Sequence, residues 1–330
     1  MEASLARLKE IQEFARSAET FAHHRDRANI EAELREIEAR GLQVITLADA
    51  NYPKPLRAID AAPPVLYLKW EYVEKDELGI AIVGTRRPSS YGIMIAEKLA
   101  KELGELGFTI VSGLALGIDT SAHRGALATK ARTIAVLGGG FSNIYPQENR
   151  NLVEEIARSG AVMSEYSLKT PPDRWTFPRR NRIISGLTRG TIVVEAPQRS
   201  GALITAKFAL EQGRYVFAVP GPITEEASKG THQLIQQGAK LVTDIDDILA
   251  EFADLQETLS SHRAILQKPR PSLSPVEEQV FQVLQYEPLH FNEIVERTQL
   301  SPTETSYALL QLVMKDIVKE LAGQRYAKLP

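Results

Sequence analysis

The sequence of 330 residues contains no cysteine, which excludes disulfide bonds, thiolate nucleophiles and cysteine-based zinc sites. It also contains no run of about 18 apolar residues, and no apolar core follows the charged N-terminal segment. Neither a membrane-spanning helix nor a secretory signal is therefore indicated. Because a chain without cysteine is compatible with a reducing compartment, we predict a cytoplasmic protein without membrane attachment.

Two nucleotide-binding motifs are also missing. A dinucleotide site needs Gly-x-Gly-x-x-Gly after the first strand, but the turn at this place reads Gly84-Thr85-Arg86-Arg87-Pro88. No Gly-x-x-x-x-Gly-Lys-Ser/Thr motif occurs, so ATP hydrolysis by a P-loop is not supported. We predict that the protein uses no cofactor and no metal ion.

What is present indicates a globular chain of two or three domains, with 43% hydrophobic and 25% charged residues. Residues 1–40 carry apolar side chains at helical spacing, which predicts two helices that end at Gly41. A short strand at Leu42–Leu47 and a proline-rich stretch at residues 51–64 follow. We predict that residues 1–62 form a small helical N-terminal module.

From Gly79 onward, an apolar strand, a turn containing glycine or serine, and a helix alternate repeatedly. Strands are expected at Val65–Lys69, Ile80–Val83, Thr109–Val111, Thr133–Leu137, Ala161–Met163, Ile192–Val194, Tyr215–Val219 and Lys240–Thr243. Continuous apolar strands between helices are typical of a parallel sheet that is covered on both faces. Residues 63–254 are therefore predicted to form a Rossmann-like, doubly wound, mostly parallel sheet of the α/β class.

The C-terminal part is expected to be a separate domain. Residues 255–272 are polar and proline-containing, as in a linker, and residues 273–330 predict three short helices followed by a hairpin. This order is typical of a winged-helix domain. After Pro271 we count eight acidic and five basic residues, so tight reading of duplex DNA is less favoured than protein binding or weak DNA binding.

Positive charge is concentrated between Pro171 and Arg214. This stretch holds eight basic residues and three acidic ones, an excess of +5, whereas the whole chain is formally −3. Glycine and serine turns at strand ends also place free backbone N–H groups and helix N-termini along one edge of a parallel sheet, which suits phosphates. Several arginines at that edge favour a large or repeated anion.

Three observations have both a functional and a structural interpretation. Asp119 and His123 could form an acid/base pair, or their spacing of four residues could reflect capping and packing. Glu195, at the end of an apolar strand, could be a general base or a structural acceptor of hydrogen bonds. Three aromatic residues could stack on a base or pack in the core, namely Trp175, Phe177 and Phe208.

An ordered series of motifs runs through the middle of the chain. The motifs are Val83–Arg86, Ser112–Asp119 with Ala122 and His123, Gly138–Gly140 with Ile144–Pro146 and Asn149, Phe177–Leu187, Ser200–Ala206 and Gly213–Gly221. Together they closely resemble the DNA-processing protein A (DprA/Smf) family. The resemblance covers residues 50–250 densely. The N-terminal region departs from the family, since it lacks the Gly-Val-Gly type of helix-hairpin-helix turn that longer members carry.

This resemblance implies a non-catalytic protein that binds single-stranded DNA, forms a homodimer, protects incoming DNA and loads the RecA recombinase during natural transformation and recombination. The family's DNA-contacting positions would be Gly84, Arg86, Ser112, Gly113, Arg174, Arg180, Asn181, Arg182, Ser200, Gly201 and Lys207. The family's self-association segment resembles residues 230–242, which places His232 and Leu241 at a dimer interface.

A rival function is an enzyme on the same kind of fold that cleaves the glycosidic bond of a nucleoside monophosphate. Such enzymes need a Pro-Gly-Gly-x-Gly-Thr-x-x-Glu turn. The corresponding residues here, Gly138-Gly139-Gly140-Phe141-Ser142, lack its threonine and glutamate.

Overall fold

The computed structural model describes residues 30–252, 272–315 and 317–329. The chain divides into two compact units between Gln43 and Val44. In the first unit, helix α3 (Ile30–Ala39) confirms the second of the two expected N-terminal helices, while the first lies outside the described residues. None of the described helices is long and apolar enough to cross a membrane.

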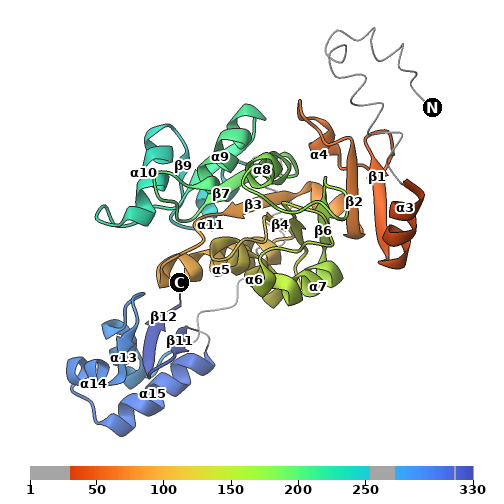
Figure 1. Ribbon diagram of the computed structural model, residues 1–330. Helices are drawn as coiled ribbons and strands as arrows, with labels where there is room; N and C mark the ends of the chain where they lie inside the picture. Colours follow the sequence, from red (N-terminus) through yellow and green to blue (C-terminus); the bar gives the residue numbers. More distant parts are fainter. Residues whose placement is uncertain (1–29, 253–271, 316, 330) are drawn as a thin grey trace, which may run out of the picture. The chain divides into compact units, whose positions relative to one another are not determined.

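Nine strands form the main sheet in the order β1-β2-β6-β5-β4-β3-β7-β8-β9 (Figure 1). They are β1 (Leu42–Thr46), β2 (Val65–Trp70), β3 (Gly79–Val83), β4 (Thr109–Ser112), β5 (Thr133–Val136), β6 (Ala161–Ser164), β7 (Gly190–Val193), β8 (Tyr215–Ala218) and β9 (Lys240–Leu241). Pairing is parallel from β6 through to β9, whereas β2 lies antiparallel to β6. The predicted mostly parallel α/β sheet is confirmed.

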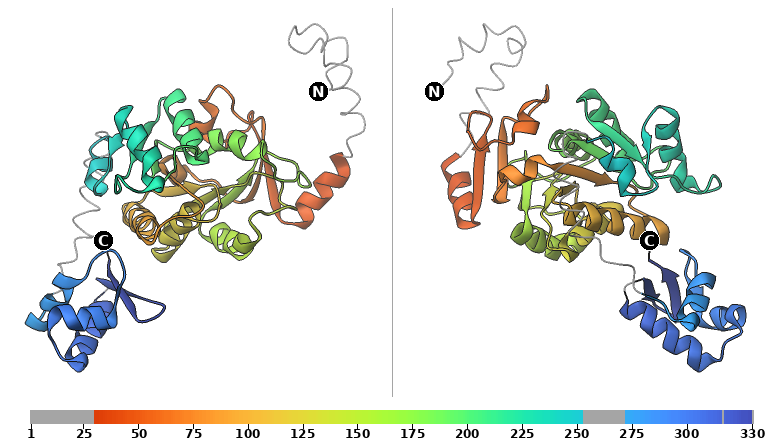
Figure 2. Two further views of the ribbon diagram at one scale, coloured as in Figure 1. Left: turned by 60° about the vertical axis from the view of Figure 1, so that its left-hand side comes forward. Right: turned by 180° about the vertical axis from the view of Figure 1, so that it is seen from behind.

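Helices cover both faces of this sheet, with α5, α6 and α7 on one side and α8 and α9 on the other (Figure 2). The helices that follow α3 are α4 (Lys54–Arg57), α5 (Ser90–Glu105), α6 (Ile118–Ala128), α7 (Arg150–Ser159), α8 (Thr176–Gly186), α9 (Gly201–Glu211), α10 (Lys229–Gln236) and α11 (Ile245–Leu249). Successive strand side chains alternate between the two cores: Ile80 and Ile82 join one, Ala81 and Val83 the other. Burial on both faces explains why the strands read as continuous apolar runs.

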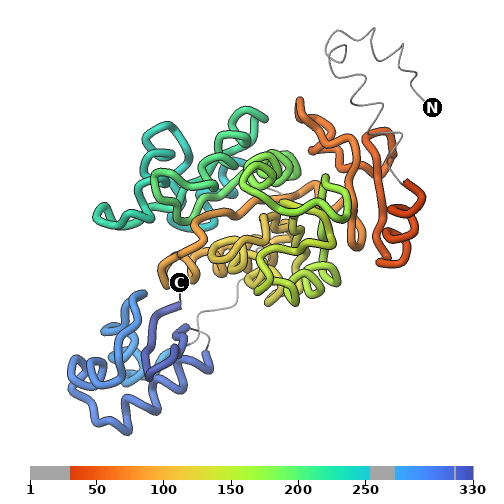
Figure 3. Tube along the Cα trace, in the orientation of Figure 1, coloured from red at the N-terminus to blue at the C-terminus, as the bar shows by residue number. Residues whose placement is uncertain are grey.

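The stretch before the predicted boundary at residue 62 contributes to the main core. Tyr52, Leu56 and Ile59 are buried in the cluster that also contains Leu66 and residues of α8. The Tyr52 hydroxyl donates a hydrogen bond to the carbonyl oxygen of Pro63 at 2.7 Å. Figure 3 shows the chain continuing from this stretch into β2, which lies beside β6. The domain limits stay a prediction, but these contacts favour an earlier boundary than residue 62.

The order of the strands creates a switch point between β3 and β7. The chain moves outward from β3 through β4 and β5 to β6, and then returns to the opposite side of β3 as β7. Loops that leave the two strands therefore diverge, and a crevice forms at their carboxyl ends. The turn that begins at Gly84 and the segment from Val194 to Ser200 lie at this crevice.

The C-terminal domain contains α13 (Pro275–Val283), β10 (Leu289–His290), α14 (Phe291–Thr298), α15 (Pro302–Met314), β11 (Val318–Leu321) and β12 (Arg325–Lys328). Its three strands are antiparallel in the order β10-β12-β11. Ser274 and Ser301 cap α13 and α15 through reciprocal bonds with a glutamate three residues later. Three helices and a hairpin confirm the predicted winged helix, and the short strand β10 is an addition that was not predicted.

Candidate functional site

A groove of about 690 Å³ opens at the carboxyl ends of β3 and β7. Four arginines and two aspartates line it, namely Arg86, Arg174, Arg180, Arg199, Asp119 and Asp173. Arginine side chains outnumber carboxylates, so the groove favours an anionic ligand. Its position at the switch point agrees with the edge that the sequence indicated.

The first turn of the groove follows β3. A side chain at Gly84 would place Cβ 2.6 Å from Cγ1 of Ile118 and 2.8 Å from the carbonyl oxygen of Glu195, so only glycine fits. The amide of Thr85 donates to the Glu195 carbonyl at 2.7 Å. Arg86 is exposed, lines the groove, and its guanidinium lies 5.3 Å from the centre of the Phe177 ring. The turn therefore presents Arg86 to a ligand from a fixed backbone.

Glu195 is a structural acceptor in this arrangement. Its carboxylate accepts hydrogen bonds from the backbone N–H of Ser89 at 2.9 Å and from the Ser89 hydroxyl at 2.5 Å. Gly92 leaves room for it, because a Cβ there would meet the carboxylate at 2.3 Å. Glu195 is only 6% exposed and fastens the first turn to the start of α5. This supports the structural interpretation over the general base.

The second turn, after β4, is supported by Asp119. The Asp119 carboxylate accepts from the amides of Gly113 at 3.1 Å and Ala115 at 3.3 Å. Ser112 is fully buried, and its hydroxyl donates to the carbonyl of Ile82 at 2.7 Å. Ser112 therefore presents no free group to the groove, and neither it nor Gly113 belongs to the lining of the main groove.

His123 packs in the core. It is fully buried, and its Nδ1 lies 2.7 Å from the hydroxyl of Thr133. Burial and the nearby Arg180 charge lower the pKa of His123 to about 3, so the imidazole is neutral at pH 7. With Asp119 committed to backbone amides, the packing interpretation of this pair is supported.

Arg180 forms the floor of the groove. It is 4% exposed, and its Nη1 donates to the carbonyl of Gly113 at 2.7 Å and to that of Val136. Burial lowers the pKa of Arg180 to about 10, while the Asp119 charge opposes this shift, so the guanidinium stays protonated at neutral pH. Arg180 therefore connects α8 with the ends of two strands, β4 and β5, and supplies positive charge beneath the groove.

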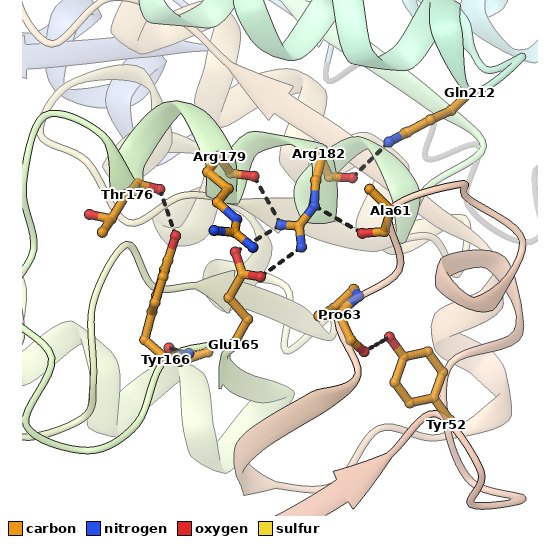
Figure 4. Close-up of polar contacts among 10 residues, drawn as sticks. Tyr52, Ala61, Pro63, Glu165, Tyr166, Thr176, Arg179, Arg182 and Gln212 are labelled. Carbon is orange, nitrogen blue, oxygen red and sulfur yellow. Dashed lines mark hydrogen bonds and ion pairs between the residues drawn. The ribbon is translucent and has the colours of Figure 1, made fainter. Parts of the chain in front are cut away.

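Arg182 lies elsewhere, although it follows Arg180 by two residues. Its guanidinium pairs with the Glu165 carboxylate at 2.6 Å and donates to the carbonyl of Ala61 at 2.9 Å (Figure 4). It is 7% exposed and is not among the residues that line the groove. The structure thus assigns Arg182 to an internal ion pair that connects α8 with the loop before β2.

The N-terminus of α9 forms another side of the groove. The Ser200 hydroxyl caps this helix by accepting from the amide of Ala202, and the Asn181 side chain donates to the carbonyl of Gly201 at 3.1 Å. A Cβ at Gly201 would meet nothing within 4 Å, so open space adjoins this helix end. An 11-residue helix that points its N-terminus at a basic groove adds favourable charge for an anion.

Two basic residues near α9 differ from expectation. Lys207 is exposed and outside the groove, with its ammonium 3.6 Å from the Glu211 carboxylate. Arg199, directly before the Ser200 cap, lines the groove although we did not single it out from the sequence. The sequence signal that could have identified Arg199 is its place in the loop between β7 and the helix cap at Ser200.

Aromatic side chains lie along one side of the groove. Tyr145 and Phe177 line it, with their ring centres 5.8 Å apart. Trp175 is 70% exposed and lies between the groove residues Arg174 and Phe177 in the sequence, while Phe208 does not line the groove. Aromatic faces beside arginines are typical of sites that bind single-stranded nucleic acid.

The two residues expected at a dimer interface lie near the last strand of the sheet. Leu241 is 39% exposed in the edge strand β9. His232, in α10, is half-buried, and its Nε2 lies 2.9 Å from the carbonyl of Gly221. An exposed leucine on a sheet edge is available for self-association.

Replacing Arg86 by alanine should weaken binding of a polyanionic strand by about 1–3 kcal/mol, the range for charge-assisted hydrogen bonds. The fold should be retained because Arg86 is exposed. Fluorescence anisotropy with labelled oligo-dT measures the affinity, and circular dichroism checks the fold. Lys207→Ala is the matched control, since it also removes one exposed cation, and it should change affinity little. Equal losses in both variants would contradict the assignment of the groove.

Known families and proteins match this chain over most of its length. Residues 43–253 match the family described as DNA recombination-mediator protein A, and residues 265–324 match the DprA winged helix domain. Protein Smf of a Synechocystis strain is 37% identical over 327 residues, covering 89% of this chain and 82% of that protein. The DNA processing protein DprA of Bacillus subtilis is 44% identical over 216 residues, covering 65% and 73%.

Two solved structures are also similar. DNA processing protein A from Streptococcus pneumoniae has 42% identity and a TM-score of 0.66, and the match covers 74% of this chain and 86% of that one. DNA processing protein A from Helicobacter pylori, which was studied for its single-stranded DNA binding mode, has 31% identity and a TM-score of 0.57. That match covers 64% of this chain and 96% of the Helicobacter chain.

Proposed function

Since this chain belongs to the DNA recombination-mediator protein A family, we propose that it binds single-stranded DNA, protects incoming strands and loads the RecA recombinase onto them. We further propose that it acts in the cytoplasm without catalysing a reaction. The family has a role in DNA processing and recombination, and the H. pylori relative has a described single-stranded DNA binding mode.

The observation that carries this proposal is the basic groove with its aromatic side. Arg86, Arg174 and Arg199 lie at its surface and Arg180 beneath it, so several phosphates of one strand can be contacted in succession. Tyr145, which is 50% exposed and packs beside Phe177, adds a ring face for unpaired bases, which a duplex keeps stacked inside. Gly84, Asn181, Ser200 and Gly201 are proposed to contact the strand as well. Gly113 is proposed as a contact too, because it lines a small pocket that shares Arg86, Tyr145 and Phe177 with the groove. Ser112 and Arg182 are bonded internally, and Lys207 lies outside the groove, so the proposal assigns them no direct contact.

We also propose that the protein works as a homodimer through the β9 edge. Leu241 and His232 would lie near the two-fold axis, so each contact would occur twice. A dimer presents two grooves to one strand, which raises the effective concentration of the second site once the first is occupied. This arrangement would suit the delivery of a coated strand to a filament-forming recombinase.

The rival enzyme is separated from this proposal by its product. Cleavage of a nucleoside monophosphate would release a free base, whereas a strand-binding protein leaves the nucleotide intact. A base-release assay on nucleoside monophosphates, run beside a gel shift with a labelled oligonucleotide, distinguishes the two functions. Base release without a gel shift would overturn the proposal.

Binding to single strands should depend strongly on salt. If three or four phosphates are neutralised, raising the salt from about 50 mM to about 200 mM should weaken oligo-dT binding about 20- to 50-fold. Duplex of the same length should bind more weakly, because paired bases cannot reach the aromatic side chains. Anisotropy titrations over a salt series measure both quantities. Affinity that is independent of salt, or equal for duplex at every salt concentration, would contradict strand binding in this groove.

A further inference from the structure

Trp175 adjoins the groove through its neighbour Arg174, although its own side chain is not among the residues that line the groove. Its indole is 70% exposed, although its sequence neighbour Arg174 and Phe177, two residues further on, line the groove. The residue lies at the N-cap position of α8, directly before the helix that carries Arg180. The ring is thus placed beside the proposed strand path and is covered less than most large side chains of this domain.

The backbone that carries this ring is firmly held. The Asp173 carboxylate accepts hydrogen bonds from the amide of Trp175 at 2.6 Å and from that of Thr176 at 2.9 Å. The Thr176 hydroxyl accepts in turn from the amide of Asp173 at 2.9 Å. These bonds fasten the segment to the start of α8, so a ligand would meet a ring on a pre-organised support, which reduces the entropy lost on binding.

A cation already contacts the ring. The guanidinium of Arg174 lies 5.0 Å from the centre of the Trp175 ring. Among the described residues, it is the one ring partner that we find for this indole. A nucleotide has a flat base beside an anionic phosphate, and Trp175 with Arg174 offers a flat ring beside a cation.

The other two aromatic candidates are less suited to this role. Phe177 is wedged against the Gly138 turn, where a Cβ would lie 2.5 Å from the phenyl ring, and Arg86 covers it. Phe208 is half-buried on α9, outside the groove. Of the three, Trp175 alone combines an exposed ring with a neighbouring groove arginine.

We propose that Trp175 is a base-stacking subsite at the mouth of the groove, where its indole holds one nucleobase while Arg174 contacts an adjacent phosphate. The inference rests on the proposed function, because it names the part of a single strand that the groove mouth recognises. Stacking tolerates any base, so the subsite would add affinity without sequence preference.

Intrinsic fluorescence reports directly on this subsite because the chain has only two tryptophans, Trp70 and Trp175. In a Trp70→Phe variant, Trp175 is the sole tryptophan, and saturation with oligo-dT should quench most of its emission. In the matched Trp175→Phe variant, Trp70 remains, and the same titration should leave emission nearly unchanged. Trp70 is 55% exposed at the end of β2, which β6, β5 and β4 separate from β3 in the sheet, so it is a suitable internal control.

An oligonucleotide without bases separates stacking from a merely structural role. Trp175→Leu keeps an apolar side chain but removes the ring, and it should bind oligo-dT about 5- to 100-fold more weakly. Trp175→Phe should recover most of this loss. Toward an abasic strand of the same length, the wild type and Trp175→Leu should bind equally.

Two outcomes would overturn the subsite. One is oligo-dT binding without quenching of Trp175, and the other is an equal loss of affinity for oligo-dT and the abasic strand in Trp175→Leu. Either result would leave strand binding itself intact. Failure of the wild type to bind both oligonucleotides would instead refute the proposed function, so the two failures are distinguishable.

Discussion

The Arg180→Ala variant should be about 3–5 kcal/mol less stable toward unfolding than the wild type, because it breaks a buried charged network. Its affinity for single-stranded DNA should fall as well, because the positive charge beneath the groove is lost. The variant leaves two buried carbonyl groups, those of Gly113 and Val136, without their donor. It also removes the positive charge that favours the ionised carboxylate of Asp119, which burial alone would disfavour. Arg180 differs in this respect from the exposed Arg86, because Arg180 is only 4% exposed.

Urea unfolding followed by circular dichroism measures the stability of this variant, and anisotropy at low temperature measures its affinity. Arg86→Ala is the matched control, since it removes an exposed groove arginine and should change stability by no more than about 0.5 kcal/mol. Adding Asp119→Asn to Arg180→Ala should restore part of the stability, because it removes the uncompensated carboxylate. Wild-type stability of Arg180→Ala would show that the network contributes little.

The Leu241→Arg variant should be a folded monomer. Leu241 is 39% exposed in an edge strand, so arginine can be accommodated in the isolated chain, whereas a two-fold interface would bring two such charges together. If both charges are desolvated there, the cost to association is on the order of several kcal/mol. The monomer should still bind short oligonucleotides but should bridge long ones poorly and load RecA less well.

Analytical ultracentrifugation and thermal melting test this expectation together. The wild type should sediment at twice the mass of the chain, and the variant at the mass of the chain with a cooperative melt near that of the wild type. Leu310→Arg provides the control, because it makes the same change at an exposed leucine of α15 in the winged-helix domain. A dimer that persists in Leu241→Arg, or a melt that disappears, would contradict the proposed interface.

The elements of the fold were predictable because their signals are local. Apolar runs such as Ile80–Val83 and Thr109–Val111 correspond to β3 and β4 within one residue at each end. The winged helix was likewise predicted from three short helices followed by a hairpin, and the structure adds that serine caps begin α13 and α15. Strand β10, with only two residues, has too short a pattern to stand out.

Two neighbouring arginines of α8 show what the local sequence could not predict, namely which side chain faces the groove. Arg180 and Arg182 are the same residue type in one basic turn, and the sequence favoured both as DNA contacts. Two residues along a helix correspond to a rotation of about 200°, so their side chains leave on nearly opposite sides. Arg180 therefore reaches the groove floor, while Arg182 reaches Glu165 and the loop that contains Ala61. Lys207 lies outside the groove for a different reason, since it is about 10 Å along α9 from the capped end of that helix.

By itself, the sequence determined the order of strands and helices along the chain, the basic character of one sheet edge and the glycine-containing turns at that edge. These properties depend on residues close together in the chain. Only the tertiary structure decided which polar groups remain free for a ligand, because internal partners come from distant segments. Ser89 meets Glu195 across 106 positions, and Arg182 meets Ala61 across 121. Such pairs occupy a charge or a hydroxyl without leaving a local pattern. Arg86 and Trp175, in contrast, stay exposed because no distant part of the described chain covers them.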